Sequence, residues 1–141
     1  MRKKRSWITM AVLAAALAFA VPSPVKAETK SWEFEATFPT GSFKAIKSAS
    51  KKDESTDWYL TINKTNNGVA NNLSSTNRFG CMVKKGNASA STSHDFGKYV
   101  SAYKMTYTVD VAPKNTIQLM GRKDPSSTAA KSLQVSGRFT P

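Results

Sequence analysis

The feature that most constrains the fold of this chain is a two-residue alternation of apolar and polar side chains. The alternation is longest over 99–111, where the odd positions are mostly aromatic or aliphatic and the even positions include Lys104, Thr106 and Asp110. Successive side chains of a β-strand point to opposite faces, so this pattern is typical of a strand with one face buried. It predicts a strand over 99–111 with Tyr99 and Val109 on its buried face.

Shorter segments repeat the alternation along the rest of the chain. They predict strands over 31–38, 58–63, 78–84, 116–120 and 133–139, and a shorter element over 43–47. The side chains expected to face inward are Trp32, Phe34, Ala36, Phe38, Trp58, Leu60, Ile62, Phe79, Cys81, Val83, Ile117, Leu119, Leu133, Val135 and Phe139. Six to eight short strands separated by turn signals predict an all-β fold, either an antiparallel β-sandwich or a partly closed barrel.

The segments between these strands contain turn-forming and charged residues. Residues 48–57 are charged and rich in serine, so we expect a solvated loop there. The segment 65–77 is polar and rich in asparagine, and Val69 and Leu73 could let part of it pair as an irregular edge strand. Pro113 suits the second position of a type I turn over 112–115. Asp124 and Pro125 could begin a short helix, although a loop fits the short spacing better. Gly137 predicts a bulge in the last strand.

Residues 1–27 have the three parts of a secretory signal peptide. A basic start is followed by an apolar helical stretch over 8–21 and by a tail that ends in Val25-Lys26-Ala27. The apolar stretch is shorter than the roughly 20 residues that a membrane-spanning helix needs. We therefore expect cleavage between Ala27 and Glu28, secretion of 28–141 as a single all-β domain, and no stable membrane anchor.

The charge of the chain is divided between the signal peptide and the domain that follows. The whole chain has a formal net charge of +12, and residues 1–27 contain five basic and no acidic residues, so 28–141 retains +7. Its lysines are scattered and no nucleic-acid motif accompanies them, so no nucleic-acid partner is expected. For an exported protein, the anionic partner expected is a cell-wall polymer or an extracellular glycan.

Few residues of the chain suit catalysis or metal binding. His94 is the only histidine and is expected to be solvated, although Ser93 and Asp95 flank it. Glu33 and Glu35 would lie about 7 Å apart on one strand face, as solubilising charges usually do. Cys81 excludes an intramolecular disulfide because it is the only cysteine, and it is expected to be a core residue. We predict no enzyme activity, no metal and no cofactor.

The tyrosines of 99–111 have two possible roles. Tyr99, Tyr103, Met105 and Tyr107 would share one face, which either packs in the core or stacks against a ligand. The greater polarity of the opposite face favours the core. The residues predicted to contact a ligand are Tyr99, Tyr103, Tyr107, Lys84, Lys85 and Lys104.

The signal peptide, the single cysteine and the closing segment 135–141 give the chain a general likeness. In these features it resembles small exported proteins of Gram-positive bacteria from uncharacterised families, and this resemblance implies no role for any residue. We expect a secreted, non-enzymatic binding protein for an anionic cell-wall polymer or a glycan. The alternatives are a bacteriocin-like or toxin-like antagonist and a small extracellular hydrolase.

Overall fold

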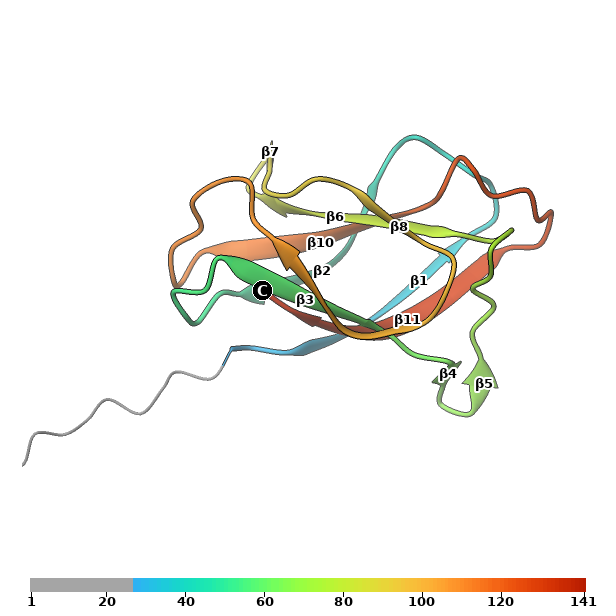
Figure 1. The fold of residues 1–141 in the computed structure, drawn as a ribbon, viewed down its shortest axis with the longest axis horizontal. Helices are drawn as coiled ribbons and strands as arrows, with labels where there is room; N and C mark the ends of the chain where they lie inside the picture. The colour runs from blue at the N-terminus through green and yellow to red at the C-terminus, as the bar shows by residue number, and fades with distance from the viewer. Residues whose placement is uncertain (1–26) are drawn as a thin grey trace, which may run out of the picture.

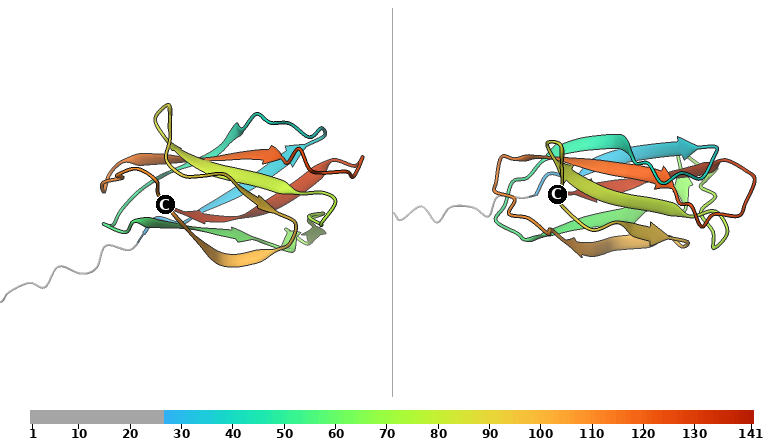
Figure 2. Two further views of the ribbon diagram at one scale, coloured as in Figure 1. Left: turned by 45° about the horizontal axis from the view of Figure 1, so that its top comes forward. Right: turned by 90° about the horizontal axis from the view of Figure 1, so that it is seen from above.

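The computed structural model describes residues 27–141, so the predicted signal peptide lies outside the described residues except for Ala27. The described residues form eleven β-strands and contain no helix, including none that could cross a membrane. The strands form two antiparallel sheets, which pack face to face, and a separate hairpin (Figures 1 and 2). The predicted β-sandwich is confirmed, and the alternative of a partly closed barrel is wrong.

Sheet A contains four strands in the order β1, β11, β3, β9. Sheet B has the order β2, β10, β6, β7, and β8 also pairs with β6. Strands β4 and β5 form the hairpin. The bounds are β1 Lys30–Ala36, β2 Lys44–Ser50, β3 Asp57–Ile62, β4 Thr65–Asn66, β5 Val69–Ala70, β6 Phe79–Lys85, β7 Ala88–Ser89, β8 His94–Phe96, β9 Val100–Thr106, β10 Thr116–Lys123 and β11 Leu133–Thr140.

The core lies between the two sheets and is formed by the side chains that the alternation assigned to it. Every predicted inward residue of β3, β6, β10 and β11 is buried, and Trp32 of β1 is buried with them. Trp32 stacks on Phe79 with ring centroids 5.2 Å apart, which joins sheet A to sheet B. Cys81 is buried in the same cluster, as expected for a core residue.

The prediction of one long strand over 99–111 is wrong. Strand β9 covers only Val100–Thr106, and its pairing with β3 shifts register between Leu60 and Ile62. Ala102, which lies opposite this shift, has a positive φ of 45°. Before this irregularity the inward face changes, so that Val100 packs against the core, whereas Met105 and Tyr107 after it are buried as predicted. Val109 lies beyond the end of the strand and is 43% exposed rather than buried.

Two other details of the strand predictions are also wrong. Strand β1 ends at Ala36, so Phe38 lies outside it and is 78% exposed. Gly137 does not form a bulge, because it pairs in register with both Trp32 and Ile62. A Cβ at Gly137 would lie 1.7 Å from the carbonyl oxygen of Thr61, so the glycine allows two neighbouring strands to approach closely.

The predicted loop over 48–57 is partly strand, and its lysine pair is not fully solvated. Strand β2 continues to Ser50, and Lys51 is completely buried with its Nζ 2.8 Å from Asp53 Oδ1. Of the two adjacent lysines Lys51 and Lys52, Lys52 is the exposed one. A second lysine, Lys123 at the end of β10, is also completely buried.

Of the two remaining connections, the turn over 112–115 differs from its prediction and the segment after Asp124 agrees with it. The turn after Pro113 has its Asn115 N–H donating to the carbonyl of Ala112, but Lys114 has φ of 70°. A positive φ at the third position defines a type II turn, so the prediction of type I is wrong. The segment after Asp124 is a loop, as favoured.

Candidate functional site

The β4–β5 hairpin is formed by a local sequence signal. Asn67 and Gly68, between the two strands, both have positive φ, of 48° and 82°. This pair of conformations defines a type I′ turn, for which Asn-Gly is the preferred dipeptide. The hairpin projects from the sandwich (Figure 1) and is tied to sheet A, because Asn66 Nδ2 donates to Glu33 Oε1 at 2.7 Å.

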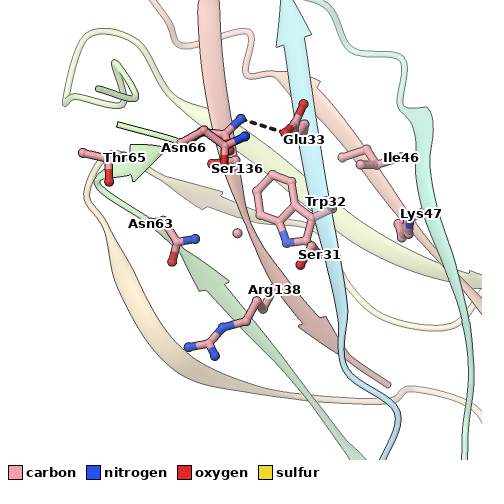
Figure 3. Close-up of a pocket in the computed structure, with 12 residues that line it drawn as sticks. Ser31, Trp32, Glu33, Ile46, Lys47, Asn63, Thr65, Asn66, Ser136 and Arg138 are labelled. Carbon is pink, nitrogen blue, oxygen red and sulfur yellow. Dashed lines mark hydrogen bonds between the residues drawn. The ribbon is translucent and has the colours of Figure 1, made fainter. Parts of the chain in front are cut away.

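A hollow of about 700 Å³ lies between this hairpin and strands β1 and β11. Figure 3 shows Trp32 near its centre, with Asn63 and Arg138 to one side of β1 and Lys47 of β2 to the other. Its lining residues are Ser31, Trp32, Glu33, Ile46, Lys47, Asn63, Thr65, Asn66, Asn67, Ser136, Gly137 and Arg138.

A second hollow, of about 460 Å³, continues the first along the same face. The two share Glu33, Asn66 and Asn67. The second hollow adds Phe34, Glu35, Val69, Ala70, Asn71, Gln134 and Val135. We call the two hollows together the hairpin groove. It combines amides, hydroxyls, two carboxylates and two cations along one outer face of the sandwich.

Hydrogen bonds to residues far along the chain hold the walls of the groove. Asn71 Nδ2 donates to the carbonyl oxygen of Asn63 at 2.8 Å and to Ser136 Oγ at 2.9 Å. These bonds join the segment around the hairpin to β11 and bury Ser136, which lies on the outer face of sheet A. In contrast, the side-chain amide of Asn63 and the guanidinium of Arg138, which both line the groove, have no hydrogen-bond partner among the described residues.

Trp32 contributes an unsatisfied polar atom beside the groove. Its indole is buried, and Nε1 has no hydrogen-bond partner within residues 27–141. A buried donor without an acceptor costs about 1–3 kcal/mol.

Glu33 and Glu35 lie on the exposed face of β1, as the alternation predicted. Glu33 accepts the hydrogen bond from Asn66, and Glu35 Oε1 accepts one from Gln134 Nε2 at 3.4 Å. Both carboxylates are therefore part of the wall of the groove. The signal that would have located this wall is the Asn67-Gly68 dipeptide, which lies in the polar segment 65–77, where an irregular edge strand at Val69 was the only pairing predicted.

The four residues of the predicted tyrosine stripe occupy different environments. Tyr99 precedes β9, is half-buried, and donates from its hydroxyl to the carbonyl oxygen of Asn71 at 2.7 Å. Met105 and Tyr107 are core residues, and burial raises the pKa of the Tyr107 hydroxyl. Tyr103 is 40% exposed. The stripe is therefore mostly core, with one exposed ring.

The three predicted lysine contacts are also separated. Lys84 is half-buried on β6, and Lys85 donates from Nζ to the carbonyl oxygen of Asp110 at 3.0 Å. Lys104 forms an ion pair of 3.1 Å with Asp57. Of the six predicted contacts, none is among the lining residues of the hairpin groove, and Tyr103, Lys104 and Tyr107 line two other hollows.

The residues considered for catalysis are dispersed in the structure. His94 is not fully solvated as expected, because it is half-buried on β8 and lies 3.3 Å from the Tyr103 hydroxyl. Burial raises the pKa of the Cys81 thiol. Within the part of the chain that the structure describes, no three His, Cys, Asp or Glu side chains are grouped to hold a metal ion.

The fold and the groove define this protein as a disulfide-free antiparallel β-sandwich with a polar surface groove. No protein-family model, curated protein or solved structure matches the chain.

Proposed function

We propose that this chain is an exported, non-enzymatic binding protein and that its ligand is a cell-surface glycan bound in the hairpin groove. The observation that supports this proposal is the set of hydrogen-bonding groups along the groove. Sugar hydroxyls both donate and accept, and the amides of Asn63, Asn67 and Gln134 offer both functions at each side chain. The carboxylates accept, and the guanidinium of Arg138 donates.

The charges of the groove favour a glycan over a polyanion as its occupant. Two carboxylates, Glu33 and Glu35, face two cations, Lys47 and Arg138, so the lining residues carry no net charge. The net charge of +7 over 28–141 has a different effect, because it attracts the protein to an anionic wall from a distance. Charge would bring the protein to the surface, and hydrogen bonds in the groove would hold the glycan.

The test is retention of the purified protein on isolated Gram-positive cell walls at low and high salt. Because hydrogen bonds in the groove are less screened than long-range attraction, we expect retention to persist at high salt. The double variant Asn63→Ala, Arg138→Gln should lose this salt-resistant retention. Lys131→Gln, which removes the same charge from an exposed site elsewhere, should keep it.

The opposite pattern would contradict the proposal that the hairpin groove binds a glycan. If salt releases the wild-type protein completely and the double variant behaves as Lys131→Gln does, then only general attraction to anionic polymers remains. Thermal unfolding of each variant shows whether a lost interaction reflects a lost fold. Neither Asn63 nor Arg138 uses its side chain in a hydrogen bond or ion pair to another described residue, so both variants should fold.

A further inference from the structure

A third hollow lies at the opposite side of the sandwich, beside an edge strand of each sheet. Strand β8 is at the edge of sheet B, and β9 is at the edge of sheet A. The hollow has a volume of about 490 Å³. The residues of its lining that matter here are Ser75, Arg78, His94, Phe96, Lys98 and Tyr103.

Arg78 is the unusual member of this lining. Its backbone is held at both polar atoms, because its N–H donates to Ser127 Oγ at 2.9 Å and its carbonyl accepts from the N–H of Asp124 at 2.9 Å. Its guanidinium has no ion pair and no hydrogen bond within residues 27–141, and Nε is buried. A half-buried cation without a counter-charge is costly, and a bound anion would remove that cost.

The neighbouring arginine provides an internal comparison. Arg122, on β10, also has a buried Nε without a partner among residues 27–141, but its Nη2 has two carboxylate partners, at 3.1 Å from Asp124 and 3.6 Å from Asp95. Gly80 makes this arrangement possible, because a Cβ there would lie within 3 Å of both Arg122 and Asp95. Among the described residues, the Arg122 pairing therefore occupies Asp95, the single carboxylate in the lining of this hollow, and leaves Arg78 and Lys98 as cations without partners there.

An aromatic wall stands beside these cations. The ring of Phe96 meets that of Tyr103 edge to face, with centroids 5.2 Å apart and an interplanar angle of 86°. The imidazole of His94 lies against both rings, with its centroid 5.7 Å from that of Phe96 and 5.5 Å from that of Tyr103. These contacts hold the exposed Tyr103 ring in place, and such a ring can stack on the apolar face of a sugar.

We infer that this hollow, the seam pocket, binds a phosphate group carried on a sugar, with Arg78 and Lys98 holding the phosphate and Tyr103 the sugar ring. The planar fork of a guanidinium matches the oxygens of phosphate in a bidentate arrangement. The Ser75 hydroxyl can add a further donor. This inference does not depend on the hairpin groove, which lies on the outer face of sheet A and shares no lining residue with the seam pocket.

The phosphate has two possible sources, a free sugar phosphate or a phosphate-linked wall polymer. The experiment is a titration of the purified protein with glucose 1-phosphate, poly(glycerol phosphate), inorganic phosphate and glucose, monitored by backbone amide chemical shifts. We expect the shifts of Arg78, Gly97 and Lys98 to move with the phosphate-bearing probes and not with glucose alone. Tighter binding of glucose 1-phosphate indicates the free sugar phosphate, and tighter binding of the polymer indicates the wall.

Variants separate this pocket from general attraction to anions. Arg78→Gln should weaken glucose 1-phosphate binding at least about tenfold, the usual loss for a charge-assisted hydrogen bond. Lys52→Gln removes the same charge from an exposed site and should leave affinity unchanged. Arg78→Lys keeps the positive charge but not the planar guanidinium. Its affinity for glucose 1-phosphate should lie between those of Arg78→Gln and Lys52→Gln.

Two results would overturn the inference. One is the absence of chemical-shift changes with every phosphate-bearing probe. The other is an equal loss of glucose 1-phosphate affinity in Arg78→Gln and Lys52→Gln, which would mean that the net charge of the protein, and not this pocket, attracts the phosphate. If Arg78→Gln does not fold, Lys98→Gln and Tyr103→Ala repeat the test from exposed positions. Asn63→Ala with Arg138→Gln should leave phosphate binding intact, so failure of the glycan proposal is distinguishable from failure of this one.

Discussion

At the scale of single residues, Lys123 shows how a charged side chain lies inside this sandwich. Its Nζ donates to the carbonyl oxygens of Ala129 and Lys131, both at 2.8 Å, and of Thr37 at 3.2 Å. These three bonds use all three ammonium hydrogens. They also join the connection after β1 to the loop between β10 and β11, so one side chain fixes two connections at one end of the molecule.

Replacement of Lys123 by methionine tests this role. Met keeps the length and much of the volume of the side chain but leaves the carbonyl groups of Thr37, Ala129 and Lys131 without this donor. We expect the free energy of unfolding to fall by about 3 kcal/mol, measured by urea denaturation. Lys131→Met, an exposed control, should change it by less than about 0.5 kcal/mol. Equal stability of the two variants would contradict the role assigned to the ammonium group.

At the scale of strands, Gly137 determines how closely β11 and β3 approach. A Cβ at this position would lie 1.7 Å from the carbonyl oxygen of Thr61 and 3.1 Å from Trp32. Because the nearest atom belongs to the backbone of a paired strand, it cannot move aside without breaking the pairing of β3 with β11.

The variant Gly137→Ala should therefore be strongly destabilised. We expect a loss of about 3 kcal/mol or more, because overpacking against a fixed backbone forces the two strands apart. Gly41→Ala is the matched control, since a Cβ at Gly41 meets no atom within 4 Å. Thermal unfolding of both variants measures the difference. A Gly137→Ala protein as stable as Gly41→Ala would show that sheet A separates easily.

The edge strand β9 is attached to β3 by a group that titrates. A hydrogen bond from Thr106 Oγ1 and the ion pair with Lys104 hold the pKa of Asp57 below its ordinary value. A lowered pKa in the folded state means that the carboxylate stabilises the fold above the unfolded-state pKa of about 3.9. This stabilisation is lost as the pH falls through the folded-state pKa.

The variant Asp57→Asn removes this pH dependence. We expect its melting temperature to be lower than that of the wild type at pH 7, and the difference to narrow as the pH falls below about 4. Asp110→Asn serves as the control, because Asp110 is exposed and its carboxylate has no ion-pair partner among the described residues. A difference that stays constant down to the lowest pH would show that Asp57 acts through packing alone.

At the scale of the whole molecule, Cys81 reports on the integrity of the sandwich. It is completely buried between the sheets, and this burial raises the pKa of its thiol. The thiolate is the reactive species, so the native thiol should be inert.

Labelling of Cys81 should therefore follow global unfolding. At pH 8 we expect a water-soluble thiol reagent to react with the native protein at least 100-fold more slowly than with the protein in concentrated urea. Partial urea should speed labelling in step with loss of tertiary structure, measured by tryptophan fluorescence. Rapid labelling of the native protein would indicate that the sheets separate locally without global unfolding.

The strands were more predictable than the groove because their signal is local. The alternation at Trp58, Leu60 and Ile62 depends only on neighbours two residues away. It failed where a bulge shifts the phase, as at Ala102, because pairing with another strand decides where a bulge occurs. Val100 illustrates the result, since it lies at an even position predicted to face outward but pairs with Ile62 before the bulge and packs against the core.

The sequence by itself therefore determined the fold class, the inward residues of most strands and the core position of Cys81, because these follow from short-range periodicity. The tertiary structure decided which lysines are buried, how the hairpin and β1 enclose a groove, and that Arg78 has no counter-charge among residues 27–141. Each of these depends on groups far apart in the chain, such as Lys123 and Thr37, which are 86 residues apart. Burial and electrostatic pairing are set by three-dimensional proximity, which residue spacing along a strand does not encode.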